Sequence, residues 1–368
     1  MYRGFLITSH EYKMKVSSFS IIKKLLILFL VITGLHFAKD FLMPLTIAGV
    51  LATLLLPFCR WMESKRVPKG LAVIFSMLVL LTALAGVGVL LGWQISELVN
   101  DFATLKQKFI ETGIRFQNYI FDHLDISIKR QSQILQDEQP SVGGILQIVG
   151  DSLIYIFTNF IFVLAYIFFL LYYRSHLRSF ILKLTRNSQQ GEMIKMLKCI
   201  THVSQQYILG LAKMIFLLWI MYGIGFSVIG VKNAIFFAVL CGLLEVIPFV
   251  GNIIGISITV LIAFVNGASL TMLAAIIGTY LVVQFIQGWL LEPIILGPHV
   301  KINPFTTVLA LVLGNLIWGI PGIFLAIPLI AMVKIVCDNI ESLKPYGFLI
   351  GEIVTGKEKK KLVKKWEK

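Results

Sequence analysis

Long apolar runs recur along the whole chain, and they constrain its fold more than any other feature. A hydrocarbon core about 30 Å thick needs roughly 20 consecutive apolar residues to be crossed by one helix. Apolar runs suited to crossing, the first two as a close pair, lie at 25–38 and 41–58, 71–94, 152–173, 208–229 and 268–288. Hydrophobic residues make up 57% of the 368 residues and charged residues only 14%, a composition too apolar for an ordinary soluble domain. The sequence therefore predicts an all-α polytopic membrane protein with about six full transmembrane helices.

Only Lys39 and Asp40 separate the first two runs. We therefore expect an antiparallel hairpin, with Pro44 in the first turn of its second helix, where a missing N–H group costs little. Lys23 and Lys24 precede the first run, an arrangement that would also suit a signal peptide. The continuation into a second apolar run favours a retained membrane anchor.

The formal net charge of +14 is distributed by loop. Segments 1–24, 59–70 and 174–206 and the tail 357–368 are rich in Lys and Arg, whereas 95–151 has 5 basic and 8 acidic residues. Basic loops tend to stay on the cytoplasmic side of a membrane. We therefore expect both termini to be cytoplasmic and 95–151 to be external. This sorting argues against a nucleic-acid partner and favours a lipid bilayer.

The chain divides into five expected parts. They are the transmembrane helices of 1–94, an external amphipathic helical module at 95–151, a transmembrane helix and a cytoplasmic interfacial helix at 152–206, a transport core at 207–343 and a basic cytoplasmic tail at 344–368. The external module is either a helical cap or an oligomer contact. The basic, amphipathic segment 174–206 suits an anionic membrane surface, with entry into the membrane at Tyr207.

Two longer apolar runs, 234–266 and 305–337, are each interrupted. The first contains GLLEVIPFVGNIIG, from Gly242 to Gly255, which leaves arms of about 14 and 15 residues. Each arm would reach only about 21 Å at 1.5 Å per residue, short of a full crossing. The second run is interrupted in WGIPGIF, from Trp318 to Phe324. We therefore predict two broken, re-entrant helical hairpins that flank one intact helix at 268–288.

Paired Gly- and Pro-interrupted helices indicate a transport site near the middle of the membrane, because irregular backbone there must face protein or a water-filled cavity. A carboxylate in an apolar run is costly unless a cavity, a partner or a moving cation compensates it. Glu245 is therefore the leading candidate, either ionised against a cation or protonated in a relay. Alternatively, Glu245 caps N–H groups at the turn or lies near the wet surface.

The remaining polar candidates follow the intact helix. Gln284 and Gln287 share one helical face through their spacing of three, either for a pathway or for hydrogen bonds between helices. Glu292 could instead position the following loop through Lys301. The substrate or ion pathway is predicted to include Glu245, Pro248, Gly251, Asn252, Gln284, Gln287, Glu292, Pro321 and Gly322.

Metal, disulfide and cofactor chemistry is not indicated. The four cysteines and six histidines form no metal-binding spacing. The chain has no GxxxxGK[ST] loop, no HExxH motif and no pair of membrane aspartates, which argues against an ATP-driven pump and against an intramembrane enzyme.

Five motifs carry a family resemblance. They are QQYILG at Gln205–Gly210, EVIPFVG at Glu245–Gly251, LEPIILG at Leu291–Gly297, Pro304, and GIPGIFLAIP at Gly319–Pro328. As a set they resemble the AI-2E family of transporters, also known as the autoinducer-2 exporter or PerM-like permease family, and the plan is similar over nearly the whole chain.

The resemblance implies an oligomeric bacterial inner-membrane protein that moves a small solute or ion. Some relatives are associated with an autoinducer-2-like furanone and others with exchange of Na⁺ for H⁺. Asn252 departs from the usual proline after the glycine, and Asn303 departs from the usual pattern before Pro304. Because these departures touch the expected site, the substrate does not follow from the resemblance.

The leading functional hypothesis is a secondary transporter or exporter that works without ATP. A cation/proton antiporter and a passive channel are the nearest alternatives. A structural membrane scaffold would need neither Glu245 nor two broken helices, so it is the weakest hypothesis.

Overall fold

The structure, a computed structural model, describes residues 18–100, 107, 111, 142–248, 250–297 and 301–352. Within these residues every regular element is helical, and one isolated bridge joins Ile302 to Gly351. The predicted all-α class is confirmed. Most of the expected external module at 95–151, and the tail from 353 to 368, lie outside the described residues.

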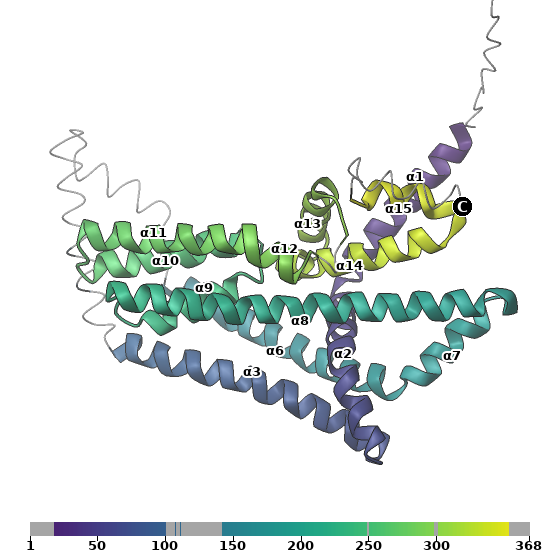
Figure 1. Ribbon diagram of the computed structural model, residues 1–368, viewed down its shortest axis with the longest axis horizontal. Helices are drawn as coiled ribbons and strands as arrows, with labels where there is room; N and C mark the ends of the chain where they lie inside the picture. The colour runs from purple at the N-terminus through teal and green to yellow at the C-terminus, as the bar shows by residue number, and fades with distance from the viewer. Residues whose placement is uncertain are drawn as a thin grey trace, which may run out of the picture.

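The helices follow the chain in the order shown in Figure 1. The first half comprises α1 (Ser18–Phe37), α2 (Lys39–Ser64), α3 (Lys69–Asn100), α6 (Val142–Tyr172), α7 (Arg174–Leu184) and the 3₁₀ turn η1 (Asn187–Gln189). The second half comprises α8 (Gln190–Ile229), α9 (Ala234–Leu244), α10 (Val250–Val265), α11 (Leu270–Ile286), the π-helical turn η2 (Gln287–Leu291), α12 (Glu292–Ile295), α13 (Pro304–Trp318), α14 (Ile320–Asn339), the 3₁₀ turn η3 (Glu341–Leu343) and α15 (Lys344–Ile350).

The predicted antiparallel hairpin of the first two helices is wrong. Helical hydrogen bonds continue across the junction, from Ala38 N to Gly34 O at 2.9 Å and from Leu42 N to Ala38 O at 2.8 Å. Lys39 and Asp40 are the first two residues of α2 and form no turn. α2 accordingly continues away from α1 instead of folding back along it (Figure 1). The physical reason is that neither residue breaks a helix as Gly or Pro does.

Six helices in the described part of the chain are long and apolar enough to cross a membrane. They are Lys39–Ser64, Lys69–Trp93, Tyr155–Tyr172, Asn187–Ile229, Leu270–Ile295 and Ile320–Asn339. The predicted number is confirmed, but one member differs. The first run contributes only the shorter apolar stretch Leu25–Phe37, whereas α14 continues through Pro328 to reach 20 residues.

Helix α8 is one continuous element of 40 residues, which corresponds to about 60 Å at 1.5 Å per residue. The expected division between 206 and 207 therefore falls inside a helix. In the basic segment, α7 and the 3₁₀ turn η1 come first, and the residues from Gln190 onward belong to α8.

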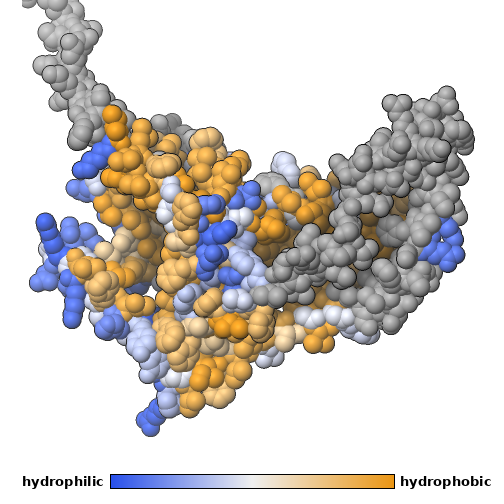
Figure 2. All heavy atoms as spheres, turned by 180° about the vertical axis from the view of Figure 1, so that it is seen from behind, coloured by the Kyte–Doolittle hydropathy of each residue, from blue (hydrophilic) through white to orange (hydrophobic). Residues whose placement is uncertain are grey.

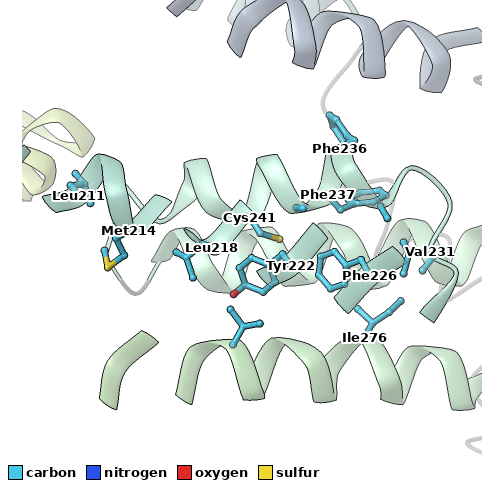
Figure 3. Close-up of a cluster of buried hydrophobic side chains, with 14 residues drawn as sticks. Leu211, Met214, Leu218, Tyr222, Phe226, Val231, Phe236, Phe237, Cys241 and Ile276 are labelled. Atoms are coloured by element: carbon cyan, nitrogen blue, oxygen red, sulfur yellow. The ribbon is translucent and has the colours of Figure 1, made fainter. Parts of the chain in front are cut away.

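The main apolar core lies along α8. Its buried residues Leu211, Met214, Leu218, Tyr222 and Phe226 recur every three or four positions and form one stripe. Figure 3 shows this stripe together with α9 residues and with Ile276 of α11. A single long helix thus carries the packing surface for the elements around the candidate site.

Much of the exterior consists of exposed apolar side chains, more than is usual for a protein in water. Apolar side chains cover much of the face in Figure 2, and hydrophilic ones lie at its left edge and in a smaller patch near its centre. Large apolar residues are exposed on every candidate span, including Phe162 at 46% and Val228 at 82%. Contiguous apolar surface of this kind is typical of contact with lipid.

Candidate functional site

The first broken run folds as a tight helical hairpin. α9 has 11 residues and α10 has 16, and Glu245 follows the last residue of α9. A Cβ atom on Gly251 would lie 1.7 Å from the carbonyl oxygen of Leu244, and one on Gly255 would lie 3.1 Å from Sγ of Cys241. The two glycines let α10 approach α9 closely, since any larger residue at 251 would collide with backbone.

The turn places Glu245 in the interior, where its side chain is 6% exposed. Its Oε1 atom accepts hydrogen bonds from Nε2 of Gln287 at 2.5 Å and from Nδ2 of Asn252 at 3.3 Å. Glu245 is therefore held by amides from two different elements, the turn after α11 and the start of α10.

Three further bonds close the cluster. Asn252 Nδ2 also donates to Oε1 of Gln284 at 3.0 Å. Gln284 Nε2 donates to Oε1 of Gln287 at 3.2 Å and to the hydroxyl oxygen of Tyr222 at 3.0 Å. We call these five residues, Tyr222, Glu245, Asn252, Gln284 and Gln287, the polar cluster.

The π-helical turn η2 begins at Gln287. Such a turn inserts an extra residue into a helix and re-aims the side chains at that point, often at functional sites. The contact between Gln284 and Gln287 shows that the two glutamines share one face, as their spacing predicts. Gln287 is 2% exposed, so its side chain lies in the interior of the protein.

One atom of the cluster has no partner. Oε2 of Glu245 is buried and accepts no hydrogen bond from any residue that the structure describes. An unpaired buried carboxylate oxygen is costly, and a cation or a proton on it would remove that cost. The cluster can thus offer one carboxylate oxygen to a cationic or hydrogen-bond-donating ligand while amides hold the other oxygen in place.

Glu292 is exposed, and its carboxylate interacts with the side chain of Gln287, at the edge of the polar cluster. It is near enough for its charge to act on Glu245 and on the buried Tyr207. Lys301 is exposed as well, and the ion pairs of the described residues include none between it and Glu292.

The second broken run also forms a hairpin, but an asymmetric one. α13 has 15 residues and α14 has 20, with Gly319 at φ 65° between them. A Cβ atom on Gly322 would lie 1.9 Å from the carbonyl oxygen of Gly314, so the helices touch through these glycines. The turn is held to α1 by a bond of 3.0 Å from Trp318 Nε1 to Leu35 O.

The structure therefore unites only part of the predicted pathway. Glu245, Asn252, Gln284 and Gln287 lie in the polar cluster, and Pro248 and Gly251 shape the turn beside it. Pro321 and Gly322 belong to the other hairpin, and no hydrogen bond in the described part of the chain joins that hairpin to Glu245.

Sequence reasoning missed Tyr222. It is 1% exposed, and its hydroxyl oxygen accepts a hydrogen bond from Nε2 of Gln284. Its place in the apolar stripe of α8 was a signal that it is buried, but no sequence pattern gave it a polar partner. Among the described residues, no group of three or more His, Cys, Asp or Glu side chains could hold a metal ion.

Comparison with known proteins adds independent information. A family model described as "AI-2E family transporter" matches residues 25–342. YrrI of Bacillus subtilis (strain 168) is 24% identical over 306 residues, which cover 81% of this chain and 86% of that protein. YhhT of Escherichia coli (strain K12) is 24% identical over 338 residues, which cover 90% and 94%. Both are named "putative transport protein".

A third relative has a more specific name. The AI-2 transport protein TqsA of Escherichia coli (strain K12) is 21% identical over 329 residues, which cover 89% of this chain and 94% of that protein. The range matched by the family model, 25–342, includes both broken runs and the polar cluster.

Proposed function

Because the chain belongs to the AI-2E transporter family, and is thus a multi-pass membrane transport protein, we propose that it is a secondary transporter of a small solute or ion in the bacterial inner membrane. The site of transport is the polar cluster around Glu245. The C-terminal tail is cytoplasmic, following the distribution of Lys and Arg.

One observation carries the proposal. A carboxylate is buried at a helix break, amides fix one of its oxygens, and the other oxygen has no partner among the described residues. A purely structural glutamate would be expected to have both oxygens satisfied, because burial without a partner is costly. A group that binds and releases a ligand must keep one position open.

The short arms of the hairpin support the same proposal. α9 would reach about 16 Å and α10 about 24 Å, each less than the hydrocarbon thickness of about 30 Å. The hairpin can then enter the membrane and return on the same side, which brings the turn and Glu245 to an intermediate depth. Discontinuous helices at that depth are a recurrent way to build transporter sites.

Two classes of solute fit the proposal. The name of TqsA suggests an autoinducer-2-like solute for this chain as well. The carboxylate of Glu245 suggests a monovalent cation such as Na⁺ or H⁺, transported alone or exchanged. A passive channel is the mechanistic alternative. The relatives are named as transport proteins, and the proposed function has no catalytic step.

The test uses the full chain reconstituted in proteoliposomes, with empty liposomes as the reference. A panel containing Na⁺, H⁺ and a labelled autoinducer-2-type furanone is assayed for saturable uptake and for counterflow. We expect counterflow for at least one member in the parent and a strong reduction in Glu245→Gln, which removes the charge and keeps the size. Glu341→Gln, at an exposed carboxylate distant from the cluster in sequence, is the matched control.

Each outcome bears on the proposal. Counterflow that is lost in Glu245→Gln and kept in Glu341→Gln supports a carrier with its site at Glu245. Conductance that does not saturate would replace the carrier by a channel. Transport at the parental rate in a well-folded Glu245→Gln protein would exclude the proposed site.

A further inference from the structure

A cavity lies away from the polar cluster, between α2, the end of α6, α7 and the first half of α8. Its volume is about 980 Å³, at the upper end of the range for ligand sites. Figure 1 shows α2, α7 and the first half of α8, whose residues line the cavity, in the same part of the molecule. The cavity is therefore built by different helices from those that surround Glu245.

The walls of the cavity change character along its length. Gly49, Ala52 and Leu56 of α2 and Leu170 of α6 supply apolar surface inside candidate membrane spans. From Gly49 to the last lining residue of α2, Arg60, the helix rises about 16 Å, roughly half of a hydrocarbon core. The apolar part thus has the depth of one leaflet.

The other end of the cavity is basic. Arg60, Arg174, Arg178 and Lys198 line it, and no Asp or Glu is among its described lining residues. Arg60 lies near the end of one candidate span and Arg174 just after another, which puts this end at the level of the lipid headgroups. A charged rim above an apolar pocket is complementary to an amphiphilic anion.

Arg174 is fixed by its neighbours. Its guanidinium pairs with Glu63 and donates a hydrogen bond to Sγ of Cys59 at 3.2 Å. Burial alone would lower the pKa of Arg174, but the bonds to Glu63 and Cys59 raise it above its ordinary value. Arg60, Arg178 and Lys198 are exposed and can turn toward a ligand. Arg174 is then the fixed element of the rim, and the other three are the adjustable ones.

The short helix α7 presents a third relevant feature. Its apolar residues Leu177, Phe180 and Leu184 are exposed and share one face, while basic residues occupy other positions. A helix of this composition lies in the boundary between headgroups and acyl chains. The cavity beside α7 therefore opens where phospholipids are present.

We propose that this cavity binds an anionic phospholipid, with the phosphate at Arg60, Arg178 and Lys198 and an acyl chain along Gly49, Ala52 and Leu56. Basic pockets between transmembrane helices bind anionic headgroups in this way. The site differs from the proposed transport site and does not depend on which solute is carried.

The test measures bound lipid on the detergent-purified full chain by native mass spectrometry. Phosphatidylglycerol is titrated against phosphatidylcholine with identical acyl chains, and inorganic phosphate is added in excess in a separate arm. We expect the parent to retain phosphatidylglycerol selectively and to keep it in the presence of phosphate, since the acyl chain also contributes to binding.

The first variant removes the rim. In the triple variant that combines Arg60→Gln, Arg178→Gln and Lys198→Gln, the affinity for phosphatidylglycerol should fall about 100-fold. This is the typical contribution of three basic side chains near an anionic lipid. The matched control is Lys65→Gln, Lys183→Gln, Lys195→Gln, which removes the same charge from α7, α8 and the end of α2 but outside the cavity lining. It should bind as the parent does.

The second variant fills the apolar part. A Cβ atom on Gly49 would meet nothing within 4 Å, so Gly49→Phe can extend into the cavity without a backbone clash. Its affinity should fall about tenfold or more, the equivalent of about two displaced methylenes. The charges of the rim are unchanged, which separates this effect from surface attraction.

Three results would overturn the proposal. An equal loss in the rim triple variant and its control would indicate general attraction to the basic surface. Complete release by inorganic phosphate would indicate a simple anion site. Unchanged lipid binding in Gly49→Phe, with a changed oligomer mass, would assign the cavity to a neighbouring copy of the chain.

Discussion

Nε2 of Gln287 lies 2.5 Å from Oε1 of Glu245, although the two residues are 42 positions apart. This contact joins the π-helical turn after α11 to the turn between α9 and α10. Any movement of the hairpin relative to α11 must change or break it. A ligand that moves the hairpin would therefore also change the contact between Glu245 and Gln287 at the end of α11.

Removing the Gln287 amide should destabilise the protein. Gln287→Leu takes away the shortest hydrogen bond to a buried carboxylate, and we expect a loss of about 1.5–3 kcal/mol in unfolding free energy. The double variant Glu245→Leu, Gln287→Leu should recover part of this loss, because no buried charged group is then left without its donor. Thermal unfolding in detergent measures both. A double variant less stable than the single one would contradict the coupling.

Gly251→Ala should perturb the hairpin. The added Cβ atom would meet the Leu244 carbonyl oxygen at 1.7 Å, and the backbone shift that relieves it should cost about 1–3 kcal/mol or more. Gly278→Ala in α11 is the control, since nothing lies within 4 Å of its added atom. That control should be neutral or slightly stabilising by helix propensity. Equal unfolding midpoints for the two variants would argue against the close approach.

Asn303 joins the start of α13 to the end of α15. Its Oδ1 accepts a bond from Thr306 N at 2.8 Å, and its Nδ2 donates to the carbonyl oxygens of Leu349, Ile350 and Gly351. Asn303→Ala should therefore cost about 1–2 kcal/mol and expose the C-terminal segment to proteolysis.

A helix cap without such a connection provides the control for Asn303. Ser269 caps α11 through Met272 N at 3.2 Å, so Ser269→Ala should cost about 1 kcal/mol and leave C-terminal cleavage unchanged. Equal cleavage rates in Asn303→Ala and the parent would show that the connection to α15 is dispensable.

The proposed topology puts positions 270 and 301 on opposite sides of the membrane, because α11 with η2 and α12 makes one crossing between them. In a background with serine at the four native cysteines, Leu270→Cys should react with an impermeant thiol reagent on intact cells. Lys301→Cys should react only after permeabilisation. Both native residues are exposed, so access is not limited by packing. Labelling of Lys301→Cys from outside would reject a re-entrant α9–α10 hairpin.

The sequence predicted most members of the polar cluster, but not which residues they contact. Glu245 was conspicuous because a carboxylate in an apolar run is costly, and Gln284 and Gln287 were paired by helical spacing. Tyr222 was not predicted, because a tyrosine in an apolar stripe suits a core equally well with or without a polar partner. Pro321 and Gly322 were predicted to share a pathway with Glu245, but the Trp318–Phe324 turn that contains them bonds to α1.

By itself, the sequence determined the membrane-protein class, the number of long apolar helices and the position of both breaks, because hydrocarbon thickness and backbone hydrogen bonding set these locally. Only the tertiary structure decided which helix ends continue into one another, as at Ala38, and which polar side chains share a partner. Those outcomes depend on contacts between residues far apart in the chain, such as Glu245 and Gln287. A local sequence pattern does not determine which distant side chain will contact a given residue.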